Sequence, residues 1–198
     1  MTDTTLDLGP QARAVARLAL AVRDDQLAAP TPCPDLAVRH LLGHLLGLSV
    51  AFRDAGRKDL GATTDTSPES AVPDIGPGWR EELPKVLDEL AEVWRAPGPW
   101  TGTTRAGGID MPGAVAGAVA VDELVIHGWD LARATGQPYD PDPAAVRVSY
   151  EFLRAAADEN GQGGDGIFGP VVPVPDEAPL LDRAVGLSGR NPGWSAAR

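Results

Sequence analysis

The sequence predicts a mainly α-helical protein, built as a helical bundle with extra short C-terminal helices and long Pro/Gly-rich loops. Along most of its 198 residues, apolar side chains recur at intervals of three and four, which is the period of an amphipathic helix. Proline or glycine follows the periodic segments, as expected where helices end. No internal repeat divides the chain. Four or five helices joined by loops are typical of a helical bundle.

The first two helices are expected on either side of a proline-rich break. Residues 8–29 carry apolar side chains at helical spacing, and two prolines directly after them end the pattern. Asp35 offers an N-cap for a second, unusually apolar helix over residues 36–55. Gly56 is expected to end this helix. Residues 57–78 show no periodicity and are rich in turn-forming residues, which predicts a surface loop.

A third helix is expected from Trp79 to about Trp94, with Pro84 tolerated in its first turn. The segment after it, residues 100–111, contains a Gly-Gly pair and is expected to hold a minor β element. The spacing of apolar residues then predicts three further helices, which cover residues 112–135, 143–159 and 179–186. We expect residues 1–140 to form the bundle and residues 141–198 to form a helix and a Pro-rich extension packed on it. No sharp change of composition separates the two parts, so a single domain is expected overall.

Composition excludes several classes of function. The formal net charge of −11 repels phosphate backbones and anionic lipids, so neither nucleic acid nor a membrane surface is an expected partner. The single cysteine, Cys33, cannot form an internal disulfide, and the N-terminus lacks the basic start and apolar run of a signal peptide. These features indicate a cytoplasmic protein, and they leave a monomer and a homodimer both open.

All three histidines of the chain lie on the two most apolar predicted helices. Glu123 and His127 are four residues apart, so they share one face of a helix that is apolar almost all round. A carboxylate buried there needs a counter-charge, a metal ion or a proton. If the two helices are neighbours, His44, Glu123 and His127 supply two imidazoles and one carboxylate. Such a set leaves one metal position for water or substrate, as catalytic zinc sites do.

Three further residues near the predicted site are expected to have secondary roles or none. His40 is a weaker candidate for a fourth ligand, because a turn of helix separates its ring from that of His44. Asp130 is expected to orient a ligating imidazole rather than to bind the ion, and a surface pair with Arg133 is the alternative. Cys33 is expected to lie too far along the helix axis to share the ion.

Each of these features also has a structural interpretation. A Glu and a His four residues apart often form only a hydrogen-bonded pair, with no metal. Gly43 and Gly47 beside His44 let a neighbouring helix or a ligand approach closely. Three arginines, each otherwise a solvated surface residue, are candidates for binding an anionic substrate: Arg105, Arg183 and Arg190.

A family resemblance rests on three stretches, TPCPDLAVRHLLGHLLG (31–47), VDELVIHGWDLARATGQP (121–138) and FGPVVPVPDEAPLLDRAVGLSGRNP (168–192). They resemble the actinobacterial metal-binding proteins related to mycothiol-dependent maleylpyruvate isomerase. The resemblance covers nearly the whole chain and implies a DinB-like four-helix bundle. It also implies one divalent metal ion, usually zinc, with nickel or another divalent ion as the alternative. The positions that match the family's ligands are His44, Glu123 and His127.

The same resemblance implies a thiol-dependent activity. Related enzymes join or rearrange small electrophiles with mycothiol, and a metal ion suits this chemistry because it stabilises a thiolate at neutral pH. The thiol is expected to come from outside the chain, since Cys33 is expected to lie too far from the metal ion. Two alternatives remain open: a non-catalytic bundle that binds a metal or a small molecule, and a metal-dependent hydrolase with Asp122 or Asp130 as base.

Overall fold

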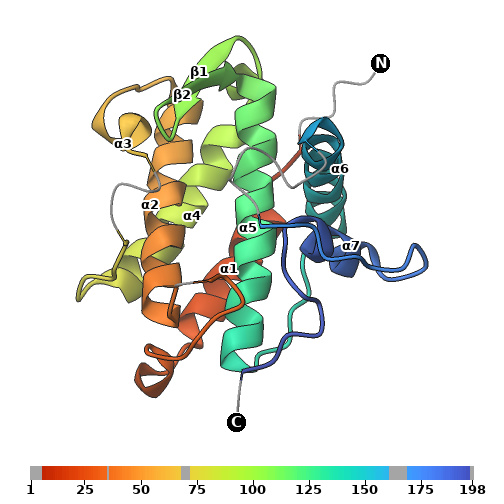
Figure 1. Cartoon of the computed structure of the whole chain (residues 1–198). Helices are drawn as coiled ribbons and strands as arrows, with labels where there is room; N and C mark the ends of the chain where they lie inside the picture. Colours follow the sequence, from red (N-terminus) through yellow and green to blue (C-terminus); the bar gives the residue numbers. More distant parts are fainter. Residues whose placement is uncertain (1–5, 35, 68–71, 161–168, 197–198) are drawn as a thin grey trace.

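Four helices enclose the core of the structure, a computed structural model that describes residues 6–34, 36–67, 72–160 and 169–196. Each helix of this bundle packs against two others: α2 lies against α4 and α5, and α1 lies against the same two helices (Figure 1). Helix α6 covers another side of α5, and α7 packs on α6. The bounds are α1 (Gly9–Leu20), α2 (Val38–Arg57), α4 (Trp79–Trp94), α5 (Gly113–Thr135), α6 (Pro143–Asn160) and α7 (Leu180–Leu187). The mainly helical fold expected from the sequence is confirmed.

Leucine and tryptophan side chains from several helices fill the centre of the bundle. Leu41, Leu87 and Leu124, from α2, α4 and α5, are fully buried, as the three-and-four spacing requires. Trp94 at the end of α4 is also fully buried, and its indole N–H donates to the carbonyl of Phe52 at 2.9 Å. The buried polar group of this large side chain is therefore satisfied.

A small hairpin closes one end of the bundle, against α2 and α5 (Figure 1). Strands β1 (Thr103–Ala106) and β2 (Ile109–Pro112) pair antiparallel. The two residues between them, Gly107 and Gly108, have φ values of 60° and 79°, as a tight hairpin turn requires. The expected β element is therefore confirmed, and Pro112 ends β2 as the N-cap of α5.

The expected first helix is wrong beyond Leu20. The chain leaves the helical path there and forms a short 3-10 helix, η1 (Asp24–Gln26). The side-chain oxygen of Gln26 accepts a hydrogen bond from the backbone N–H of Arg23, and Asp24 binds Arg80 of α4 at 2.6 Å. Two successive carboxylates would also lie at the negative end of a continued helix, which is unfavourable.

Other boundaries shift by a few residues. Helix α2 begins at Val38 and ends before Lys58, whose φ of 61° places it in the left-handed region, while the proposed cap Asp35 lies outside the described residues. A single helical turn, α3 (Ala62–Asp65), forms within the loop expected at 57–78. Pro84 is the sixth residue of α4 rather than part of its first turn.

The later helices follow the sequence expectations closely. Helix α5 ends at Thr135 and is followed by Gly136, whose φ of 69° suits a glycine stop. Helices α6 and α7 begin within a residue of their expected starts. None of the helices in the described part of the chain combines the length and the apolar character needed to cross a membrane.

Two glycines of α2 provide a matched test of the packing. A Cβ atom at Gly43 would lie 2.8 Å from the backbone of Asp74, whereas one at Gly47 would meet nothing within 4 Å. Gly43→Ala should therefore destabilise the protein by about 1–3 kcal/mol, because a backbone segment must move. Gly47→Ala should leave stability unchanged or raise it by up to about 1 kcal/mol. Thermal unfolding of both variants in chelator checks this, and equal shifts for the two would contradict the packing.

Candidate metal centre

Two histidines and one glutamate meet where α2 packs against α5. His44 Nε2 lies 3.3 Å from Glu123 Oε2, and His127 Nε2 lies 3.0 Å from the same oxygen. The two imidazole rings stand edge to face, with centroids 4.7 Å apart. The candidate ligand atoms of all three residues lie within 4.8 Å of one another. Two imidazole nitrogens and one carboxylate oxygen form a donor set that suits zinc and related divalent ions.

The charges around His127 favour a cation. Burial opposes charge on this ring, yet its hydrogen bonds to Asp130 and Glu123 raise the pKa of His127 to about 9. Burial likewise opposes charge on Glu123, but hydrogen bonds to His127 and His44 hold the pKa of that carboxyl well below its usual range. Both carboxylates thus face a centre that must carry positive charge. A divalent ion satisfies the same requirement.

Asp130 fixes the orientation of His127. Its Oδ2 lies 2.9 Å from His127 Nδ1, and its side chain is fully buried. With Nδ1 protonated and bound to Asp130, Nε2 is the nitrogen that faces Glu123, and it can bind a metal ion once it has lost its own proton. The alternative pair between Asp130 and Arg133 is wrong, because Arg133 instead donates to the backbone carbonyl of Trp194.

Arg190 supplies the counter-charge of Asp130. Its Nε and Nη2 donate to the two carboxylate oxygens at 3.3 and 3.1 Å, and its Nη1 donates to the carbonyl of Ser188. The guanidinium is itself largely buried, at 11% exposure. A residue from the C-terminal segment therefore completes the polar chain around His127.

Cys33 lies closer to the centre than the sequence argument allowed. Its sulfur, one ring nitrogen of His127 and a carboxylate oxygen of Asp130 all lie within 4.8 Å of one another. The estimate along a straight helix axis failed because the chain reverses before α2, with a bridge between Pro30 and Ala37. Burial raises the pKa of the Cys33 thiol to about 11, against the opposing effect of Arg190. The thiol is therefore neutral near pH 7 and is a poor nucleophile.

His40 and Asp122 lie outside both ligand groups. His40 Nδ1 accepts a hydrogen bond from the backbone N–H of Ala37 at 3.3 Å, which helps to start α2. Asp122 is buried against α6, where its carboxylate accepts a hydrogen bond from Ser149 Oγ at 2.6 Å. Burial raises the pKa of Asp122 to about 7 despite that bond. Among the described residues, neither side chain joins the group that contains His44.

The other two candidate arginines also lie apart from the triad. Arg105 on β1 pairs with Asp110 at 2.7 Å and with Asp65 at 3.0 Å, so its charge is already matched. Arg183 on α7 donates to the hydroxyl of Tyr150 on α6. Of the three arginines named from the sequence, Arg190 is the one that contacts a partner of the triad.

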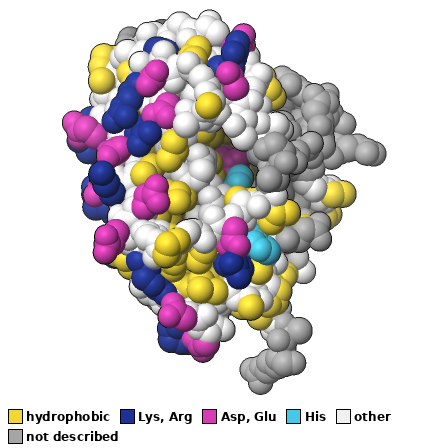
Figure 2. All heavy atoms as spheres, turned by 90° about the vertical axis from the view of Figure 1, so that its left-hand side faces the viewer, with side chains coloured by type: hydrophobic (Ala, Val, Ile, Leu, Met, Phe, Trp, Pro, Cys, Tyr) yellow, Lys and Arg dark blue, Asp and Glu magenta, His cyan; other side chains and the backbone are white. Residues whose placement is uncertain are grey.

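The histidine-bearing face is open to solvent in part. Figure 2 shows histidine side chains at the surface of this face, with acidic side chains beside them and apolar ones around them. His44 and Glu123 keep 21% and 24% of their side-chain surface, whereas His127 keeps 9%. A small molecule can therefore reach the centre from the side of His44 and Glu123.

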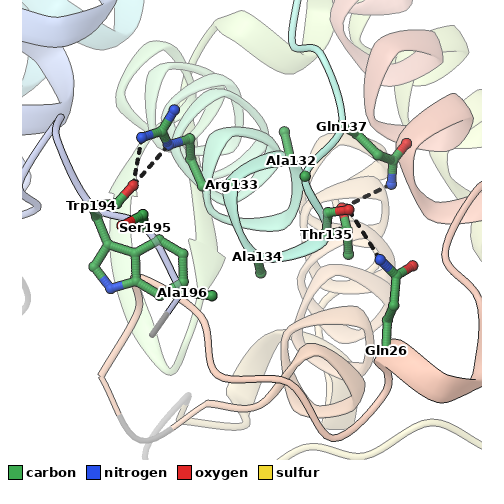
Figure 3. Close-up of a pocket in the computed structure, with 10 residues that line it drawn as sticks. Gln26, Ala132, Arg133, Ala134, Thr135, Gln137, Trp194, Ser195 and Ala196 are labelled. Carbon is green, nitrogen blue, oxygen red and sulfur yellow. Dashed lines mark hydrogen bonds between the residues drawn. The ribbon is translucent and has the colours of Figure 1, made fainter. Parts of the chain in front are cut away.

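A separate cavity of about 520 Å³ lies at the C-terminal end of α5 (Figure 3). Arg133 and Trp194 border one side of it, and the Gln26 amide donates to the carbonyl of Thr135 on the other. None of the three triad residues lines this cavity.

The positions of Arg190 and Cys33 beside the centre were not predicted from the sequence. A signal for Arg190 was present, because a carboxylate as deeply buried as Asp130 needs a cation. Which cation supplies it depends on a contact between residues 60 positions apart, and helical periodicity carries no information about such a contact.

Comparisons with known proteins agree with this fold. Residues 8–132 match the family described as "Mycothiol maleylpyruvate isomerase N-terminal domain". Two uncharacterized proteins of Mycobacterium tuberculosis, from strains CDC 1551 / Oshkosh and H37Rv, are each 29% identical over 178 residues, covering 89% of this chain and 92% of theirs.

Solved structures show the same architecture. The crystal structure of mycothiol-dependent maleylpyruvate isomerase superposes with a TM-score of 0.57 at 15% sequence identity, covering 92% of this chain and 86% of that chain. A mutant of the same enzyme superposes with a TM-score of 0.56 and the same coverage. At this identity the likeness establishes the fold.

Binding of zinc should release a proton near neutral pH. The raised pKa of about 9 means that His127 is protonated at about pH 7.5, and its Nε2 must lose that proton to bind a metal ion. Calorimetric zinc titrations in buffers of different ionisation enthalpy should show release of close to one proton per ion. Release should fall toward zero above about pH 9. An observed enthalpy independent of the buffer would contradict the assignment.

Asp130→Asn should weaken zinc binding without removing a ligand. Partners that orient a ligating histidine typically contribute about 10–100-fold to metal affinity. Competition with a chromophoric chelator measures the change, and Asp88→Asn, at an exposed position of α4, is the matched control. Equal affinities of the two variants would show that Asp130 does not support His127.

Proposed function

This chain belongs to the mycothiol maleylpyruvate isomerase N-terminal domain family, and we propose that it is a metal-dependent enzyme with a low-molecular-weight thiol, mycothiol, as cosubstrate. The reaction is transfer of the thiol to a small electrophile, or isomerisation of that electrophile. The observation that carries the proposal is the convergence of His44 Nε2 and His127 Nε2 on one oxygen of Glu123. Three protein ligands of these types are characteristic of catalytic zinc sites.

The residues present fit a zinc ion held by His44, Glu123 and His127. When bound, the ion would supply a Lewis acid that lowers the pKa of a thiol toward neutrality. Asp130 holds His127 in one orientation through Nδ1, and Arg190 balances the charge of Asp130. These contacts support the proposal because they hold the His127 ring with Nε2 toward Glu123 and balance the buried negative charge of Asp130.

An external thiol is favoured over the chain's own. Cys33 is half-buried, and burial raises its pKa to about 11, so little thiolate forms near pH 7. The partly exposed side of the triad lies at His44 and Glu123 instead. A small electrophile and a soluble thiol can both approach there.

The alternatives receive less support from the geometry. A structural zinc site requires four protein ligands, and within the described part of the chain the group around His44 contains three. A hydrolase requires a free carboxylate as base. Asp122 is bound by Ser149, and Asp130 is bound by both His127 and Arg190.

Thiol consumption tests the proposed activity. Mycothiol should be consumed with at least one member of a broad panel of electrophiles, including maleylpyruvate, by the zinc-loaded wild type. His44→Ala should lose this activity, because a metal ligand is removed, and Cys33→Ala should retain it. Absence of turnover across the panel, with zinc bound, would favour a non-catalytic binding protein.

Thermal melting tests the metal site independently of turnover. With free zinc at about 100 times its dissociation constant, binding should stabilise the fold by about 2.7 kcal/mol and raise Tm by several degrees. The shift should vanish in His127→Ala and persist in Cys33→Ala. Identical curves for chelated and zinc-loaded wild type would rule out the site.

A further inference from the structure

We propose that a second site, which shares no residue with the triad, binds a small monocarboxylate with an apolar body. The site is a cavity of about 240 Å³ between α6, α7 and the extended segment 171–176. None of its lining residues belongs to α2 or α5, which carry the candidate metal ligands. The proposal is therefore independent of the function proposed above.

The hydroxyl of Tyr150 and the guanidinium of Arg183 both have N–H or O–H groups at the cavity without an acceptor among the described residues. Arg183 Nη2 donates to the Tyr150 hydroxyl at 2.7 Å, and the guanidinium carbon lies 4.8 Å from the centroid of the Tyr150 ring. Because that hydroxyl oxygen accepts from Arg183, its own proton is available to an acceptor. Among the described residues, no acceptor binds this proton, and Arg183 donates through Nη2 alone.

The one carboxylate near Arg183 is a weak partner. Asp176 Oδ1 lies 3.5 Å from Arg183 Nη2, and its side chain is 92% exposed. Exposed pairs of this kind contribute little to stability, so a bound anion can replace Asp176 at small cost. By contrast, Arg190 and Arg105 each contact carboxylate oxygens at 3.3 Å or less. Of these three arginines, Arg183 is the one without a close carboxylate partner among the described residues, and its guanidinium can bind a carboxylate through two nitrogens.

Apart from Arg154, whose guanidinium already pairs with Glu151 at 2.9 Å, the rest of the cavity lining is apolar and fixed in place. Val172 donates its backbone N–H to the carbonyl of Gly186 at 2.9 Å, and a Cβ at Gly186 would lie 2.5 Å from the side chain of Val174. Leu187 of α7 adds to the apolar lining. Ligand cavities for drug-sized molecules measure roughly 300–1,000 Å³, so this smaller cavity suits a small acid rather than a nucleotide or a peptide.

Titration with benzoate and hexanoate, followed by NMR, tests the site on the full chain in excess chelator. Both acids should bind, and benzamide, which has the ring of benzoate but no charge, should bind at least about tenfold more weakly. Arg183→Gln should weaken benzoate binding by at least about tenfold. Tyr150→Phe, which retains the ring under Arg183, should weaken it by a smaller factor because one donor is lost.

Three controls keep the proposal falsifiable. Arg147→Gln removes an exposed arginine of α6 that does not line the cavity, and it should bind benzoate as the wild type does. His44→Ala should also bind normally, because the site does not involve the triad. If Arg183→Gln does not fold, Arg183→Lys retains the charge without the planar fork and should still bind severalfold more weakly.

The results that overturn the proposal are distinct from those that would overturn the metal centre. Failure of both acids to bind, or binding of benzamide as tight as that of benzoate, contradicts a carboxylate site. Wild-type affinity in Arg183→Gln, or in Arg183→Lys where the first variant does not fold, removes Arg183 from it. Loss of benzoate binding in His44→Ala would place the acid at the triad instead.

Discussion

The contact of one glutamate oxygen with two histidine nitrogens, where α2 packs against α5, is the interaction on which the candidate metal centre depends. Glu123 and His44 are 79 residues apart in sequence, and they meet inside a helical bundle. Most of the buried side chains of this bundle are apolar. Charge in such surroundings must be compensated. The chain compensates it with an alternating series, in which His127 lies between Glu123 and Asp130, and Asp130 lies against Arg190.

This series links the bundle to the C-terminal part of the chain. Arg190 follows α7, so its contact with Asp130 ties the last described segment to the helix that carries two of the candidate ligands. A change at Arg190 therefore acts on His127 through Asp130. The cavity beside Arg183 is lined by residues of α6, α7 and the segment 171–176, and it depends on different contacts. The C-terminal segments thus support one candidate site and build another.

Local pattern in the sequence predicted much of the fold and the placing of Glu123 and His127 on one helix face, whereas joining His44 to them required two helices to be neighbours and followed the family resemblance. Helices α4 to α7 follow from spacing and from stops such as Gly136, because those signals are local. The early end of α1 was not predictable in this way, since Arg80 and Thr135, far along the chain, bind the residues that follow α1. Cys33 was misplaced for a related reason: its position depends on a chain reversal that precedes α2.

Zinc binding by the His44–Glu123–His127 triad can be measured from the zinc content of untagged protein. After loading with zinc and removal of the excess, elemental analysis should find about one ion per wild-type chain, as a single three-ligand site requires. Glu123→Ala should retain far less than the wild type, because the oxygen shared by both imidazoles is removed. A wild type that retains no zinc, or a Glu123→Ala variant that retains as much as the wild type, would contradict the account.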